Sequence, residues 1–237
     1  MKKIAFLTVA ILALLPGSAF SQAQAFRNFI IAANSPTNPK GGKDAFQALG
    51  GQERFELSTW GKGWAISRGD EVIRDGFLFN LDHESNDLYV RDESTAQDVV
   101  VDKNSVRRFA LFNGTDTVYF VKNIAVDPQN KTFYQLLGGD PQGAVVLLKY
   151  RLAKLIPVDK NDYMRNFNGD YAPHYQSKAT YYVVDAKSGV HAYNNLGKKE
   201  LLALYPDRQE LLNAFFAEHK RPDDRALHTL FDSLNAL

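Results

Sequence analysis

Turn-forming residues that recur between short apolar runs constrain the fold of this chain more than any other feature. From Phe55 onward, runs rich in Val, Ile, Leu, Tyr and Phe alternate with Gly, Asn, Asp and Ser. Asn113-Gly114 separates two alternating runs, and because both residues tolerate positive φ, the pair predicts a hairpin with a type I′ turn. Two further hairpin connections are expected at 138–143 and 186–189. Successive hairpins predict an antiparallel sheet with a meander topology.

The C-terminal part of the chain follows a helical period instead. Apolar residues recur on one face of each of two segments: Leu211, Leu212, Phe215 and Phe216, then Leu227, Leu230, Phe231 and Leu234. Pro206 and Pro222 suit the first turn of a helix, where a missing N–H costs nothing. The expected fold class is therefore α+β, an antiparallel β-rich body, barrel-like or sandwich-like, followed by C-terminal amphipathic helices. We expect these helices to pack on the sheet, and a partner-binding helical tail is the alternative.

The first 25 residues have the pattern of a bacterial secretory signal peptide. Lys2 and Lys3 precede an apolar run from Ile4 to Leu15, and Ala23 and Ala25 form an A-x-A cleavage site. The run is shorter than the roughly 20 residues that a membrane-spanning helix needs, which disfavours an anchor. The chain has no cysteine, so it has no site for lipid attachment and no disulfide. We expect a periplasmic or secreted protein without a transmembrane segment in its mature chain.

The same patterns divide the chain into four expected parts. They are a signal peptide at 1–25, an N-terminal segment and linker at 26–52, the β-rich body at 53–195 and the C-terminal helices at 196–237. The 28 basic and 27 acidic residues nearly balance, and no long block of like charge occurs. Nucleic acid or an anionic membrane would favour a concentrated positive face, so neither is expected as a partner.

Two segments resemble metal-binding motifs without their full ligand sets. The run His83-Glu84-Ser85-Asn86-Asp87 begins like the HExxH zinc motif, but Asp87 replaces the second histidine and the composition predicts a solvated turn. The segment that starts at Asp159 begins like a calcium loop. Its sixth position is Met164 rather than Gly, and its twelfth is Asp170 rather than Glu. Neither segment is assigned as a metal site.

Catalytic and phosphate-binding patterns are also incomplete. No G-x-S-x-G turn and no cysteine nucleophile is present, and Gly41-Gly42-Lys43 lacks the other residues of a P-loop. His174 could act as a base beside Asp170, although a polar surface loop is the better interpretation. We expect His191 on a strand and His219 and His228 on helices, as packing or surface residues. The sequence therefore assigns no catalytic, cofactor-binding or metal residue and no cofactor.

The tripeptide Arg68-Gly69-Asp70 matches a cell-adhesion signal. Gly69 stands between two apolar runs, where a hairpin needs a residue that takes positive φ. We therefore interpret the tripeptide as a turn that fixes strand register.

The segment TWGKGWAISRGDEVIRDGFLFNLDHESNDLYVRD and the later SVRRFAL, TFYQLL, VVLLKY and YYVVD–VHAYN runs resemble an uncharacterised family of small secreted proteins of Bacteroidota-type bacteria. The K-K-x-x-L-x-x-x-P-D pattern in KKELLALYPDRQELLNAFF is similar to the helix entry of that family. The similarity extends from Phe55 to Leu237. It implies secretion and a β-rich body with C-terminal helices, and it supplies no catalytic residue.

These observations lead to one functional hypothesis and two alternatives. The leading hypothesis is a secreted or periplasmic, non-enzymatic binding protein of the bacterial envelope, whose partner is an unknown envelope protein. The first alternative is a barrel-like carrier of a small apolar ligand, because many aromatic residues lie in or beside the expected strands. The second alternative is a hydrolase of unrecognised type, because paired carboxylates are brought together only in space.

Overall fold

The structure, a computed structural model, describes residues 51–96, 98–141, 143–157 and 173–236, and the strands in these ranges form two antiparallel sheets. The larger sheet has the strand order β11-β10-β9-β8-β7-β6-β1-β2. Its strands are β1 (Gly63–Ser67), β2 (Val72–Ile73), β6 (Val106–Phe112), β7 (Thr117–Val121), β8 (Tyr134–Gly138), β9 (Val145–Ile156), β10 (His174–Asp185) and β11 (Gly189–Tyr193). The smaller sheet consists of β3 (Phe77–Asp82), β4 (Asp87–Asp92) and β5 (Asp98–Val100). Neither sheet closes into a barrel.

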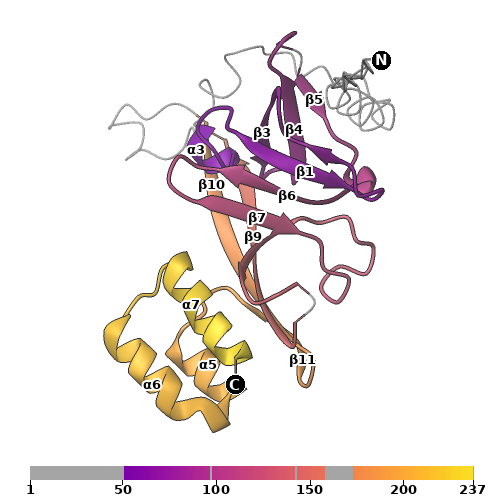
Figure 1. Cartoon of the computed structure of the whole chain (residues 1–237). Helices are drawn as coiled ribbons and strands as arrows, with labels where there is room; N and C mark the ends of the chain where they lie inside the picture. The colour runs from indigo at the N-terminus through magenta and orange to yellow at the C-terminus, as the bar shows by residue number, and fades with distance from the viewer. Residues whose placement is uncertain (1–50, 97, 142, 158–172, 237) are drawn as a thin grey trace, which may run out of the picture.

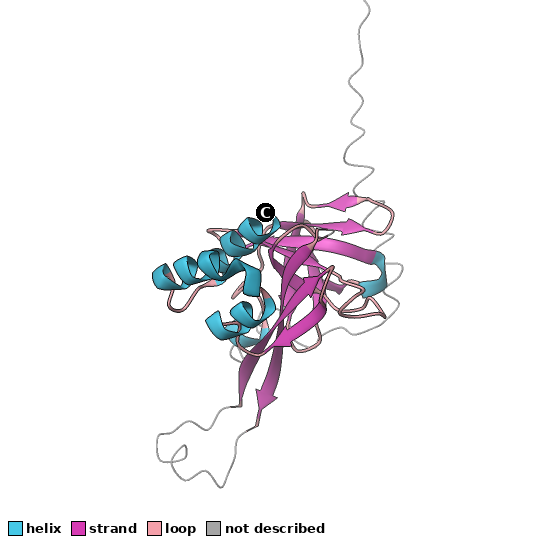
Figure 2. Ribbon diagram, turned by 90° about the horizontal axis from the view of Figure 1, so that it is seen from below, coloured by secondary structure: helices cyan, strands magenta, loops and turns pink. Residues whose placement is uncertain are grey.

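Three α-helices follow the strands, as Figure 1 shows. They are α5 (Lys198–Leu204), α6 (Gln209–Glu218) and α7 (Asp224–Asn235), with the 3-10 helix η2 (Pro206–Arg208) between the first two. A four-residue helix, α3 (Gly51–Arg54), precedes β1, and η1 (Lys103–Ser105) precedes β6. The expected fold class, an antiparallel β-rich body followed by C-terminal helices, is confirmed. In Figure 2, the C-terminal helices lie on one side of the strands.

Separate hydrophobic cores lie at the two ends of the larger sheet. The first core fills the space between the smaller sheet and β1, β6 and β7, where the ring of Phe109 contacts those of Phe120 and Phe133. The second core lies between β8–β10 and the helices, and it joins Leu147 and Val183 to apolar residues of α5, α6 and α7. The apolar stripes predicted from the helical period thus pack against the sheet. The boundary between the two cores falls near β7 and β8.

Two turns differ from the sequence predictions. The β6–β7 connection spans residues 113–116, and only Gly114 has a positive φ, so the predicted type I′ turn at Asn113-Gly114 is wrong. The side-chain Oδ1 of Asn113 instead accepts hydrogen bonds from the backbone N–H groups of Thr115 and Asp116, at 2.9 and 2.7 Å. This side-chain turn stabilises a longer loop than the sequence pattern indicated.

The β1–β2 turn contains Arg68-Gly69-Asp70, as predicted, but Asp70 rather than Gly69 takes the left-handed conformation, with φ of 63°. Asp tolerates this region because its short side chain can bond locally. Arg107 on β6 lies 2.6 Å from the Asp70 carboxylate. The tripeptide is therefore part of a turn whose acidic side chain is ion-paired to the neighbouring strand.

Several predictions fall outside the described residues: the signal peptide, Gly41-Gly42-Lys43, and the calcium-like segment from Asp159 with Asp170. Among the described helices, none is both long and apolar enough to span a membrane.

Candidate functional site

A groove lies where β7 and β8 separate. These strands pair through only Phe120↔Gln135 and Val121↔Tyr134, so the first residues of β7 and the last residues of β8 are not joined by ladder hydrogen bonds. The first turns of α7 lie across this opening. The resulting groove has a volume of about 340 Å³ and is lined by β7, β8, β9, α7 and Glu56. A volume of this size falls in the range of small-molecule sites.

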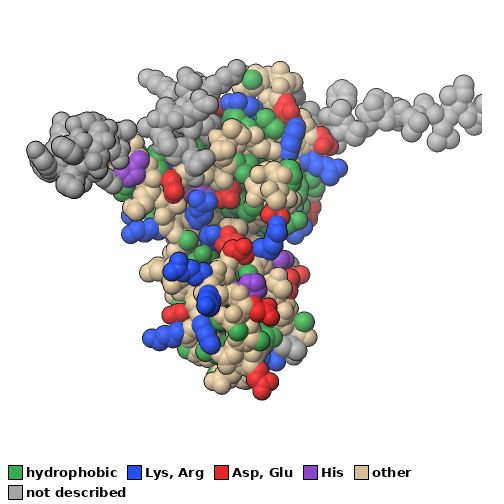
Figure 3. All heavy atoms as spheres, turned by 90° about the vertical axis from the view of Figure 1, so that its left-hand side faces the viewer, with side chains coloured by type: hydrophobic (Ala, Val, Ile, Leu, Met, Phe, Trp, Pro, Cys, Tyr) green, Lys and Arg blue, Asp and Glu red, His purple; other side chains and the backbone are tan. Residues whose placement is uncertain are grey.

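Close contact between α7 and β8 fixes one side of the groove. A Cβ atom added to Gly138 would lie 2.7 Å from Cβ of Phe231 and 3.3 Å from Cα of His228. Glycine is therefore required for the helix to approach the strand this closely. On the face shown in Figure 3, acidic, basic and histidine side chains gather where the β-rich part meets the helical part.

A hydrogen-bonded cluster of Glu56, His83 and Arg151 underlies the groove, which Glu56 and Arg151 line directly. Oε2 of Glu56 lies 2.8 Å from Nε2 of His83 and 3.2 Å from Nη1 of Arg151. The His83 side chain is 3% exposed and that of Glu56 is 11% exposed. The backbone of His83 is held on both sides, because its N–H donates to Arg54 and its carbonyl accepts from Ala153 on β9. The cluster thus joins three segments that are distant in the sequence.

The pKa of Glu56 lies below its ordinary value. Burial alone would raise the pKa, but the hydrogen bond from His83 and the electrostatic attraction of His83, Arg151 and Lys149 outweigh that effect. Glu56 is therefore deprotonated at neutral pH, and Nε2 of His83 is the donor in the bond between them. A glycosidase-type mechanism needs a protonated carboxylic acid as well as a carboxylate, and Glu56 cannot be that acid.

Two ion pairs form the walls of the groove and connect the sheet to α7. Nζ of Lys149 on β9 lies 3.0 and 2.7 Å from the two carboxylate oxygens of Asp224. Nη2 of Arg225 lies 2.7 and 2.8 Å from the two carboxylate oxygens of Asp116, in the β6–β7 loop. In each pair, the two carboxylate oxygens thus accept hydrogen bonds from a cation on another structural element.

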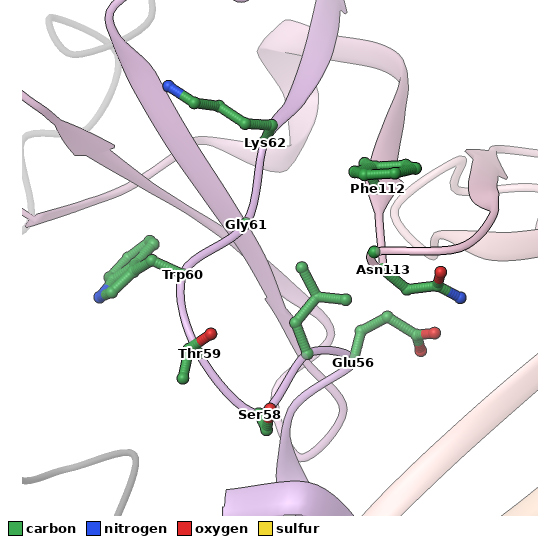
Figure 4. A pocket seen from close by; sticks show the side chains of 10 residues that line it. Glu56, Ser58, Thr59, Trp60, Gly61, Lys62, Phe112 and Asn113 are labelled. Carbon is green, nitrogen blue, oxygen red and sulfur yellow. The ribbon is translucent and has the colours of Figure 1, made fainter.

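A second, shallower groove of about 520 Å³ lies beside the first, between residues 56–62 and 112–114 (Figure 4). Its labelled side chains Trp60 and Lys62 point away from the space between these segments. Arg91 lies over the Trp60 ring at 4.5 Å, and Lys62 is paired with Glu93. Backbone atoms therefore provide much of its lining, and it has few fixed charged groups apart from Glu56, which lines both grooves.

The predicted solvated turn at residues 83–87 is only partly solvated, because Glu84 and Ser85 are exposed but His83 and Asn86 are not. The segment is a turn between β3 and β4, but His83 and Asn86 are 2% and 5% exposed. Asn86 has a φ of 57°, and its side chain accepts from Phe133 N–H at 2.8 Å and donates to Phe133 O at 3.0 Å. These two polar side chains can be buried because they form hydrogen bonds to other segments. Within the described chain, no group of three or more His, Asp or Glu side chains is placed to hold a metal ion.

The other histidines take different positions. His191 lies on β11, as predicted, and its Nε2 is 3.0 Å from Ser188 Oγ. His228 lies on α7, as predicted, and lines the first groove. His219 follows the end of α6 and caps it, so the prediction of a helical position is wrong by one residue. His174 begins β10 rather than lying in a loop, and its proposed partner Asp170 is outside the described residues.

Six charged residues that line the first groove were not identified from the sequence: Glu56, Asp116, Lys149, Arg151, Asp224 and Arg225. A pattern in the sequence could have identified two of these residues. Lys149 and Arg151 are two apart in the apolar run VVLLKYRLA, so a strand places both on one face among buried residues.

Comparison of the chain with protein-family models, with curated proteins and with solved structures finds no match.

Proposed function

We propose that the protein is a non-enzymatic binding protein of the bacterial envelope, secreted or periplasmic, and that it binds a small molecule in the groove between β7, β8, β9 and α7. The observation that carries this proposal is the groove itself, whose charged side chains are fixed by ion pairs and hydrogen bonds. Side chains held in this way lose little conformational entropy when a ligand binds. The proposed location rests on the leader-like residues 1–25 and on the resemblance to a family of secreted proteins.

The apolar carrier is less well supported by the packing. Aromatic and aliphatic side chains fill the two described cores, and the enclosed space beneath the groove, lined by His83, Asn86 and Arg151, does not admit a water-sized molecule. The open groove carries charged groups along its lining. A wholly apolar ligand would displace water from these groups without replacing the hydrogen bonds of that water, which is unfavourable.

Native mass spectrometry of protein purified from the envelope of the producing bacterium tests the proposal. A variant with a filled groove, Val118→Phe, is purified in parallel, since Val118 lines the groove and is partly buried on β7. We expect the wild-type protein to retain a small molecule that the variant lacks. A matched control, Val72→Phe, adds the same bulk at an exposed position on β2 and should retain the molecule.

Recovery of both proteins without any small molecule, or with the same one, would contradict a binding role for the groove. Circular dichroism of Val118→Phe shows whether the variant is folded. If the variant is not folded, a competition experiment on the wild-type protein replaces the comparison. In that experiment, the retained molecule competes with a ligand directed to the groove.

A further inference from the structure

Each carboxylate that lines the groove already accepts a hydrogen bond from a cation of the chain. The carboxylates of Asp116 and Asp224 each accept from a cation through both oxygens. Glu56 accepts from two donors at Oε2, and Oδ1 of Asn113 accepts from two backbone N–H groups. A ligand that enters the groove therefore meets carboxylates that already accept hydrogen bonds from cations of the chain. It should itself be rich in acceptors.

Arg151 is the donor with the most unused capacity. Its hydrogen bond within the described chain goes from Nη1 to Glu56, whereas a guanidinium carries five N–H donors. His83 also donates to Glu56, so that buried carboxylate does not depend on Arg151 alone. The Arg151 side chain is 23% exposed and lines the groove beside Lys149, which lies two residues away on the same face of β9. A planar guanidinium with free N–H groups binds a carboxylate through two parallel hydrogen bonds.

The charges and the lining of the groove further restrict the class of ligand that it can bind. The groove contains three cations, Lys149, Arg151 and Arg225, and each is paired with one carboxylate. A ligand with one negative charge disturbs this balance less than a phosphate with two. Val118, Leu136 and Leu137 also line the groove, and these apolar residues suit a hydrocarbon body.

From these contacts we infer that the groove binds a small monocarboxylic acid, with its carboxylate on Arg151 and its apolar body between β7 and β8. The inference rests on the proposed binding function and names the ligand class of the same site. It also assigns Arg151 as the residue that selects an acid over a neutral compound of the same shape.

Isothermal titration calorimetry at pH 7 with octanoate tests the inference. Octanamide is the matched neutral probe, because it has the same chain and nearly the same head-group shape. We expect octanoate to bind at one saturable site and octanamide to bind at least about tenfold more weakly, since it cannot form the two charge-assisted bonds. Inorganic phosphate serves as a second anion, and we expect it not to compete with octanoate.

The variant Arg151→Lys keeps a positive charge beside Glu56 but removes the planar pair of donors. We expect it to weaken octanoate binding about tenfold and to leave octanamide binding unchanged. The matched control is Arg107→Lys, because Arg107 is an exposed, ion-paired arginine on β6 that does not line the groove. In the wild-type protein, the side-chain Nε–Hε resonance of Arg151 should also shift on addition of octanoate, which gives a measurement that needs no variant.

Three results would each overturn the assignment of a carboxylate ligand. They are equal affinity for octanoate and octanamide, unchanged octanoate binding in Arg151→Lys, and displacement of octanoate by phosphate. The failure of this inference is distinguishable from the failure of the proposed function. If the envelope-purified protein retains a neutral or cationic molecule that Val118→Phe lacks, the groove is a binding site but not for carboxylic acids. If neither octanoate nor any envelope molecule binds, both proposals are wrong.

Discussion

Nε2 of His83 lies 2.8 Å from Oε2 of Glu56, although 27 residues separate the two in the chain. The bond connects the β3–β4 turn to the segment that leads into β1, and Arg151 of β9 joins it from the larger sheet. One buried carboxylate thus holds together the smaller sheet, the larger sheet and the lining of the candidate binding groove.

Replacement of this carboxylate should destabilise the protein. Glu56→Gln keeps the size of the side chain but removes the charge on which the bonds from His83 and Arg151 depend. We expect a loss of about 2 kcal/mol in the free energy of unfolding, measured by urea denaturation, as is typical of buried hydrogen bonds to a charged group. The control Glu93→Gln removes an exposed carboxylate paired with Lys62 and should cost less than about 1 kcal/mol. Equal losses in the two variants would contradict a structural role for the buried cluster.

The contribution of Glu56 should also depend on pH. Its pKa in the folded protein is below the ordinary value of 4.5, so between these two values the unfolded chain binds more protons than the folded chain. The stabilisation is therefore complete above about pH 4.5 and is lost as the pH falls through the folded-state pKa. Urea denaturation from pH 7 to pH 3 should show the difference between the wild-type protein and Glu56→Gln shrinking only below pH 4.5. A difference that stays constant across that range would refute the assignment of the lowered pKa.

Asn86 combines a left-handed backbone with two buried hydrogen bonds to Phe133, and two substitutions separate these effects. Both Asn86→Gly and Asn86→Ala lose the side-chain bonds, but only Ala resists a φ of 57°. We expect Asn86→Ala to be less stable than Asn86→Gly by about 1 kcal/mol in chemical denaturation. The reverse order of stability would show that backbone conformation at this turn does not limit stability.

Gly138 allows α7 to lie against β8, and Gly138→Ala should force them apart. The added Cβ would stand 2.7 Å from Cβ of Phe231. We expect a loss of about 2 kcal/mol in the free energy of unfolding, as for other overpacked interfaces, and faster amide hydrogen exchange in α7. Gly69→Ala is the control, because a Cβ there meets only Ser67 Oγ, at 3.6 Å. Unchanged exchange in α7 would mean that the helix accommodates the extra methyl group without moving.

The hairpin pattern predicted the antiparallel sheet because alternation of apolar residues and the chemistry of turns are local properties. The connections at 138–143 and 186–189 appear where the sequence indicated them, between β8 and β9 and between β10 and β11. The turn at Arg68-Gly69-Asp70 was also predicted, but the residue with positive φ was not. In the folded chain Asp70 takes this conformation and lies beside Arg107.

The groove could not be predicted in the same way. Both faces of β9 are apolar near Lys149 and Arg151, since one face contacts the helical core and the other belongs to a third apolar cluster, formed by Val121, Tyr134, Val146 and Leu148. The sequence of β9 therefore lacks the alternation of apolar and polar residues from which an inward-facing charged side chain could be recognised. The partners of these two cations, Asp224 and Glu56, are 75 and 95 residues away in the chain.

The sequence by itself determined the class of fold, the hairpin order and the helical C-terminus, because each follows from residues close together in the chain. Tertiary structure alone decided that the larger sheet splits its packing between two cores, that α7 lies across the opening at β7 and β8, and that His83 is buried on Glu56. Those outcomes depend on contacts between distant segments, whose energies no local pattern contains. The candidate binding groove belongs entirely to this second group.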